Sequence, residues 1–125
     1  MGLKPRKSTA PPPPPGCPMA ACMEVLGGAW TTAVIWKLAG DPRRFGELQK
    51  DIPDISPKML AARLRTLEQK GVVIREVAPT SPPSVEYSLS VLGRELVPVI
   101  DAIVRVGSKL RDREPVAGGA VRRRA

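Results

Sequence analysis

Two cysteines, Cys17 and Cys22, are the residues of this sequence best suited to chemistry. A thiol at the first turn of a helix is stabilised as the thiolate by the helix dipole, which would make Cys17 reactive. The alternative is that Cys17 is a small buried hydrophobe. Five residues along a helix separate two Cα atoms by ~8–9 Å, which is beyond disulfide reach. An intramolecular bond would therefore require the helix to begin after Cys17, and a bond between two subunits is easier to form.

The chain contains no histidine. A thiol-dependent enzyme would therefore lack its usual general base, and no converging carboxylates or glycine-rich loop mark a substrate site. Two cysteines without histidine also supply too few ligands for a zinc finger. We therefore expect a protein that is not an enzyme and that needs no metal or other cofactor.

The charge balance favours a polyanionic partner. The chain has 125 residues, enough for one domain, with 20 Lys and Arg against 12 Asp and Glu and a formal net charge of +8. Such an excess favours nucleic acid first and a membrane surface second. The sequence has no apolar run of about 18 residues and no signal peptide. We therefore expect a cytoplasmic protein that binds nucleic acid and no membrane.

Composition divides the chain into three parts. Residues 1–16 hold five consecutive prolines after a basic start, so we expect a disordered, basic, proline-rich tail. The hydrophobic pattern is continuous over 17–113, which we assign to the folded domain. Residues 114–125 are rich in glycine, alanine and arginine and are expected to form a second disordered basic tail. Both tails are either solvated ends or arms that contact a nucleic-acid backbone.

The spacing of apolar residues predicts three short helices in the first half of the domain. They lie within 17–28, from 29 to the break at 40–42, and within 43–53. Trp30 is expected on the packed face of the second of these helices. All three serve to build the core.

A fourth helix has well-marked ends. Ser56 suits its N-cap, Pro57 its first position and Gly71 its C-terminal stop. Three leucines at helical intervals form one apolar stripe: Leu60, Leu64 and Leu67. The opposite face is mostly polar and carries Lys58, Ala62, Arg65 and Gln69. That face is either an ordinary solvated surface or a surface that reads a ligand.

Two runs of strand-forming residues follow, at 72–78 and 84–90, on either side of a proline-stiffened tip. A two-stranded hairpin alone is marginal in water, so it must pack on the helices. Helix, turn, second helix with an outward polar face, then hairpin is the order of a winged helix-turn-helix. In that arrangement the second helix enters the DNA major groove and the hairpin, or wing, reaches the flanking backbone or minor groove. The predicted fold class is thus mainly α with a small β-hairpin.

Five motifs in this order resemble the HxlR-type transcriptional regulators, small bacterial winged helix-turn-helix proteins related to the MarR type. The motifs are CP at 17–18, LGGAW at 26–30, RRFGEL at 43–48, ISPKMLAARLRTLEQKGVV at 55–73 and PPSVEYSLSVLGREL at 82–96. The resemblance covers the chain from Cys17 to about Gly107. It implies a dimer built from the first and last helices, which presents two recognition helices to a pseudo-palindromic operator and so represses or activates a neighbouring gene.

The helix order and the resemblance together place DNA contacts on the fourth helix, on the residues before it and on the wing. The predicted DNA-binding residues are Arg43, Arg44, Ser56, Lys58, Met59, Ala62, Arg63, Arg65, Thr66, Arg75, Thr80, Ser81 and Ser84. Proteins of this type often carry a basic residue where this chain has Ala29 or Ser84. Both differences remove a phosphate contact, so the wing is expected to grip DNA less firmly than the helix does.

The last helix, within 90–114, has more apolar surface than a small core needs. Its apolar residues recur at three- and four-residue intervals, which suits internal packing or a homodimer interface. Two-fold symmetry also suits operator binding, so the homodimer is favoured. The predicted interface residues on the first and last helices are Met19, Met23, Leu96, Val99, Ile103 and Val106.

The predicted function is that of a sequence-specific transcriptional regulator that binds double-stranded DNA as a homodimer. Because some HxlR-type proteins sense oxidants or electrophiles through a cysteine at this position, the resemblance makes Cys17 the candidate redox sensor. A small molecule or an oxidant is the candidate effector. The alternative is a winged-helix protein-interaction module without sequence-specific DNA binding, whose proline run docks in an aromatic groove.

Overall fold

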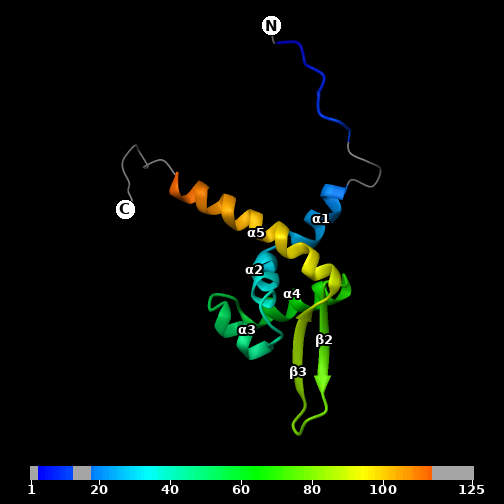
Figure 1. The fold of residues 1–125 in the computed structure, drawn as a ribbon, viewed down its shortest axis with the longest axis vertical. Coiled ribbons are helices and arrows are strands. Elements are labelled where there is room, and N and C mark those ends of the chain that lie inside the picture. The colour runs from blue at the N-terminus through cyan, green and yellow to red at the C-terminus, as the bar shows by residue number, and fades with distance from the viewer. Residues whose placement is uncertain (1–2, 13–17, 114–125) are drawn as a thin grey trace.

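The computed structural model describes residues 3–12 and 18–113. Residues 3–12 lead away from the body of the molecule without regular secondary structure (Figure 1). The helices are α1 (Pro18–Leu26), α2 (Thr31–Leu38), α3 (Phe45–Asp51), α4 (Pro57–Gln69) and α5 (Val91–Asp112), and the strands are β1 (Arg43–Arg44), β2 (Val73–Ala78) and β3 (Ser84–Leu89). The predicted fold class, a mainly helical winged helix-turn-helix with a β-hairpin, is confirmed.

The sheet has three antiparallel strands in the order β1-β3-β2. β2 and β3 form the predicted hairpin, paired from Val73 with Leu89 to Ala78 with Ser84. The prediction of two strands was incomplete, because β1 pairs with the other edge of β3, with Arg43 opposite Tyr87. Two residues are too few to produce an alternating pattern, so nothing in the sequence marks β1 as a strand.

The core lies where α2, α4 and the base of the hairpin meet beneath α5. The three leucines of the predicted stripe on α4 are all buried, which confirms that face as the packed one. The other buried apolar residues are Leu26, Val34, Ile35, Leu38, Leu48, Ile52, Ile55, Val72, Val73, Leu89 and Ile100.

The ends of α4 follow the predicted chemistry. The Ser56 hydroxyl accepts a hydrogen bond from the Met59 N–H at 3.1 Å, and Pro57 occupies the first helical position. Gly71 has φ +78°, the left-handed conformation that ends a helix and that glycine adopts without strain. The predicted N-cap, first position and C-terminal stop are therefore confirmed.

The junction between α4 and α5 is tightly packed. The Ser90 hydroxyl donates to the Gly71 carbonyl at 2.6 Å and accepts from the Gly93 N–H at 3.0 Å, so Ser90 caps α5 and fastens it to the end of α4. Gly93 is buried, and a Cβ at that position would overlap the Val72 carbonyl oxygen. The start of α5 is thereby fixed against the end of α4.

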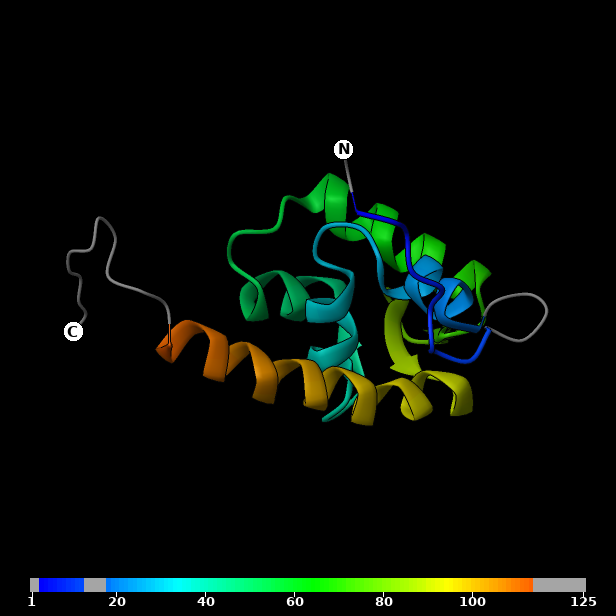
Figure 2. The same ribbon diagram turned by 90° about the horizontal axis from the view of Figure 1, so that it is seen from above.

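Helix α5 is the longest element and continues through Pro98 without interruption. Both views show its C-terminal half extending past the rest of the domain (Figures 1 and 2). Ile100 is buried, whereas Ile103 is 50% exposed and Leu110 is 67% exposed. The helix therefore contributes to the core near its middle and leaves an apolar surface beyond it.

The turn between α1 and α2 has an unusual backbone. The two helices bend by 82°, and within the turn Gly28 has φ +91° and Trp30 has φ +72°. A bulky residue at positive φ is a genuine outlier that its surroundings must hold in place. Trp30 is 36% exposed, so the expectation that it packs on the face of α2 was wrong, because it precedes the helix.

In the described part of the chain, no single helix is long and apolar enough to span a membrane. The bent pair formed by α1 and α2 reaches the required length and composition only when the two helices are taken together.

Candidate nucleic-acid interface

The outward face of α4 is the centre of the candidate interface. Lys58 and Arg65 are exposed on it, opposite the buried leucines. Met59 and Thr66, at the sides of this face, are half-buried, and so is Ala62, which lies on the face itself. The predicted DNA-binding residues of α4 thus divide into exposed cations and partly packed neighbours.

Helix α4 and the hairpin meet in one small hollow. It is lined by Ala61, Leu64, Arg65, Glu68, Arg75 and Tyr87. Arg65 comes from the outward face of α4 and Arg75 from β2, so the hollow brings a cation of α4 beside a cation of the wing. Glu68 lines the same hollow, so two cations and one carboxylate meet there. A phosphate lying across this junction can contact both arginines.

The wing extends well away from the helical body (Figure 1). At its tip the Thr80 hydroxyl donates to the Pro82 carbonyl at 2.7 Å, and Ser81 is exposed. Ser84 is half-buried opposite Ala78. Thr80 therefore stabilises the tip itself, and Ser81 is the more accessible of the two hydroxyls there.

Arg43 makes a close ion pair within the protein. Its Nε and Nη2 atoms each donate to a carboxylate oxygen of Asp51 at 2.9 Å, which joins β1 to the end of α3. The hydrogen bond with Asp51 raises the pKa of Arg43, partly offset by desolvation and assisted by the charges of Asp51 and Glu47. This bidentate pair occupies the Nε–Nη2 edge of the guanidinium.

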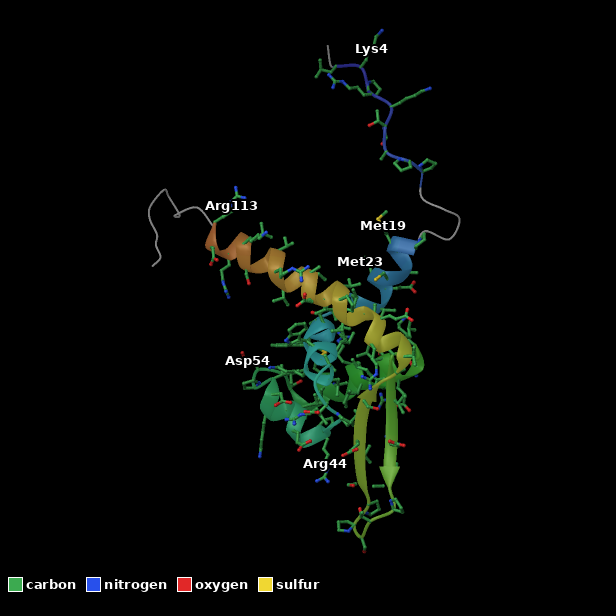
Figure 3. The ribbon with its side chains drawn as sticks, in the orientation of Figure 1. Lys4, Met19, Met23, Arg44, Asp54 and Arg113 are labelled. Atoms are coloured by element: carbon green, nitrogen blue, oxygen red, sulfur yellow. The ribbon has the colours of Figure 1, made fainter. Side chains whose placement is uncertain are left out.

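Arg44 is exposed and lies at the N-terminus of α3 (Figure 3). Its backbone N–H donates to Glu47 Oε1 at 2.8 Å, which caps the helix and leaves the side chain facing solvent. Arg43 and Arg44 are neighbours in sequence, yet only Arg44 presents its charge outward.

Arg63 points to the other side of α4 from Arg65. Its Nε–H donates to the Ala29 carbonyl at 2.7 Å, and the Cζ, Nη1 and Nη2 atoms of its guanidinium lie beside Gly28. The side chain is half-buried. The structure therefore places Arg63 against the turn between α1 and α2 and not on the outward face.

A second surface runs along α5. A shallow apolar groove is lined by Val99, Ala102, Ile103, Val106, Gly107 and Leu110. Met19 and Met23 of α1 are 70% and 62% exposed and project from the body (Figure 3). Leu96, by contrast, is half-buried against the core. Five of the six predicted interface residues are therefore exposed apolar side chains.

The predicted interface residues leave out two apolar residues on this side of α5, Leu92 and Leu110, although Leu92 belongs to the predicted apolar spacing of the helix. Leu92 is 48% exposed and Leu110 is 67% exposed, and both lie on the same side of α5 as Val99 and Ile103. The signal was present, because Leu110 follows Val106 by four residues and Leu92 precedes Val99 by seven. The stripe therefore covers most of the length of the helix.

Cys17 lies outside the described residues. Cys22 is a half-buried free thiol on α1 that packs against the edge of the core. Over residues 3–12 and 18–113, no group of three or more His, Cys, Asp or Glu side chains is placed to hold a metal ion. The chemistry that the described surface offers is that of exposed cations, hydroxyls and apolar side chains.

The HxlR-like helix-turn-helix family model matches residues 25–115, from the end of α1 through α5. The chain belongs to this family. It is a transcriptional regulator of the helix-turn-helix type, as the sequence motifs indicated.

Related proteins agree with this assignment. The HTH-type transcriptional regulator YdeP of Bacillus subtilis is 42% identical over 98 residues, which cover 78% of this chain and 77% of that protein. The redox regulator HypR in its oxidised form is 36% identical with a TM-score of 0.71 over 74% of this chain and 96% of its own. The reduced form of the transcriptional regulator YodB from B. subtilis is 37% identical with a TM-score of 0.64 over 78% of this chain and 93% of its own.

Proposed function

We propose that this HxlR-like regulator binds a pseudo-palindromic operator as a homodimer, with α4 in the major groove and the hairpin on the flanking backbone. The observation that carries the proposal is the hollow shared by Arg65 and Arg75, which makes the outward face of α4 continuous with the wing. A recognition helix and a wing on one surface can engage a single duplex together. The net charge of +8 adds a sequence-independent attraction to DNA.

The homodimer is supported by the exposed apolar residues of α1 and α5. Soluble monomers rarely expose a long contiguous apolar surface, and here both the α5 groove and two methionines of α1 are exposed. Pairing α5 with the same helix of a second copy gives a two-fold axis, and a two-fold axis matches a palindromic operator. Because α5 is fastened to the end of α4 by Ser90, the dimer interface also fixes the recognition helices relative to each other.

The DNA-binding surface is tested by measuring affinity for the DNA beside the protein's own gene in a mobility-shift assay at several salt concentrations. Replacing Arg65 or Lys58 by Ala should weaken operator binding, by about 1–3 kcal/mol if the lost contact is to a base edge. Arg111→Ala is the matched control, because it makes the same charge change in the last turn of α5, far from α4 (Figure 2). Equal affinity of the wild type, Arg65→Ala and Lys58→Ala would refute the proposed role of α4.

Sedimentation tests the dimer. Ile103→Glu places a charge on the exposed stripe and should give a folded monomer, whereas wild type should be dimeric at micromolar concentration. Val104→Glu is the control, since Val104 is also exposed but lies about 100° around the helix axis from Ile103. A monomeric wild type would reject the arrangement.

We infer a thiol response for this regulator from its relatives and from its sequence. HypR is described as a redox regulator, and YodB is also known in a quinone-bound form. The test is operator affinity before and after a mild oxidant or a quinone, in the wild type, Cys17→Ser and Cys22→Ser. The response should vanish in Cys17→Ser and persist in Cys22→Ser, and the reverse result would transfer the role to Cys22.

A further inference from the structure

The side chains of Arg63 and Arg65 point to different sides of α4 and have different surroundings. At ~100° per residue, Arg63 is about 60° and Arg65 about 140° around the axis of α4 from the buried Leu60. Arg65 therefore points away from the core. Arg63 lies at the edge of the core, on the side of α4 that is next to the turn between α1 and α2. The hydrogen bond from Arg63 Nε to the Ala29 carbonyl, 2.7 Å long, connects residues 34 positions apart.

The turn that Arg63 contacts is the strained one. Gly28 and Trp30 both have positive φ, and the carbonyl that accepts from Arg63 belongs to the residue between them. An ideal Cβ at Gly28 would lie 3.2 Å from the Arg63 guanidinium carbon, so the absence of a side chain there lets the planar group lie against the turn. A strained backbone persists only where the surroundings hold it. Two side chains donate to carbonyls of this turn: Thr31 Oγ1 to Gly27 at 3.0 Å from the first residue of α2, and Arg63 Nε to Ala29 from α4.

A second contact lies on the same side of α4. Lys70, seven residues after Arg63 and so nearly in line with it along the helix, has its Nζ 3.9 Å from Glu24 Oε1 on α1. The pair is largely exposed and weak. It shows, however, that this side of α4 faces α1 and the turn after it over two helical turns.

We propose that Arg63 is a positioning residue: it fixes α4 to the turn between α1 and α2, and it does not read DNA. This inference rests on the proposed function, in which α4 enters the major groove and α1 forms part of the dimer interface. A change in the direction of α1 is then transmitted to α4 through the Ala29 carbonyl. Arg63 thereby sets the angle at which the neighbouring Arg65 meets the operator.

The experiment compares Arg63→Ala, Arg63→Lys and Arg65→Ala. The third variant is the matched control, because it removes the same charge two residues further along the same helix. Amide hydrogen exchange is measured without DNA at Gly27 and Val34, whose N–H groups donate to the Met23 and Trp30 carbonyls at 2.7 and 3.0 Å and so bracket the turn. Operator affinity and its salt dependence are measured on the same samples.

Arg63→Ala and Arg63→Lys should both accelerate exchange at these two amides by about tenfold or more, because lysine keeps the charge but not the guanidinium geometry. Arg65→Ala should leave exchange unchanged. Both Arg63 variants should weaken operator binding by about tenfold without changing the salt slope, since no phosphate contact is lost.

Three results would overturn the proposal. They are unchanged exchange in Arg63→Ala, full recovery of operator affinity in Arg63→Lys, and a salt slope reduced by about 1 in Arg63→Ala, as loss of a phosphate contact requires. If the wild type prefers no operator sequence, the proposed function fails. In that case the exchange rates at Gly27 and Val34 in Arg63→Ala and Arg65→Ala, which are measured without DNA, still decide whether Arg63 holds the turn.

Discussion

Two arginines of α4, Arg63 and Arg65, lie two residues apart and have opposite environments. Arg63 is half-buried and donates to the Ala29 carbonyl, whereas Arg65 is exposed and lines a hollow with Arg75 of the wing. The same side-chain chemistry is thus directed inward in one case and outward in the other. The comparison shows that the residues packed beside an arginine on α4 decide whether its charge is held within the protein or presented to solvent.

The same contrast occurs before α3. Arg43 pairs bidentately with Asp51, and Arg44, the next residue, is exposed. Strand alternation explains the difference, because β1 directs successive side chains to opposite faces of the sheet. In both places, neighbouring arginines divide between fixing the scaffold and presenting charge to solvent.

The largest expected effect comes from the buried side of α4. Leu64→Ala should lower the free energy of unfolding by about 2–5 kcal/mol, because Leu64 is 2% exposed and its removal leaves a cavity in the core. Arg65→Ala, on the next residue, should change it by less than about 0.5 kcal/mol. Urea denaturation of the two variants measures both values.

Comparable losses in Leu64→Ala and Arg65→Ala would contradict the division of α4 into a packed and an outward face. The protein concentration must be held constant in these titrations, because dimerisation would add a concentration-dependent contribution to stability.

Sequence periodicity predicted the packed face of α4 and the ends of that helix. Leucines at helical spacing and the Ser-Pro start are local signals, and local signals survive without knowledge of the tertiary structure. The partner of Arg63 is not local. Ala29 lies 34 residues away and accepts through its backbone carbonyl, which every residue possesses, so no residue type announces the contact.

The strand β1 and the turn conformation of Trp30 were unpredictable for the same reason. A two-residue strand forms because β3 offers it an unpaired edge, and Trp30 has positive φ because α1 and α2 must bend by 82° between their ends. The α5 stripe, by contrast, was visible in the sequence, since its spacing depends on one helix alone. The sequence does not tell, however, whether such a row of apolar side chains is buried or exposed. That depends on how far α5 extends past the helices that it packs against.

A smaller effect is expected where α4 is joined to α5. Ser90→Ala removes the N-cap of α5 and the bond to the Gly71 carbonyl, and should lower the free energy of unfolding by about 1 kcal/mol. Exchange at Gly27 and Val34 should stay as in the wild type, because these amides lie at the turn after α1 and not at this junction. Ser88→Ala, on β3, is the control for loss of a nearby serine hydroxyl.

If Ser90→Ala accelerates exchange at the turn as strongly as Arg63→Ala, the contacts of α4 made through Arg63 and through Ser90 would belong to one cooperative unit. The contact with the turn after α1 and the contact with α5 would then not be independent, which contradicts the comparison.

The smallest effect concerns the exposed ion pair that accompanies Arg63 on its side of α4. Glu24→Gln should change the free energy of unfolding by less than about 1 kcal/mol, because Glu24 is largely exposed and 3.9 Å from Lys70. It should also leave exchange at Gly27 and Val34 unchanged, since a screened pair at this distance restrains neither helix.

Measurement at low and high salt sharpens the test: any effect of Glu24→Gln should disappear at high salt, where the pair is screened. The effect of Arg63→Ala should persist there, because a short hydrogen bond to a backbone carbonyl is screened far less than an exposed ion pair. An exchange rate in Glu24→Gln equal to that of Arg63→Ala would mean that overall charge between α1 and α4, and not the contact with Ala29, holds the turn.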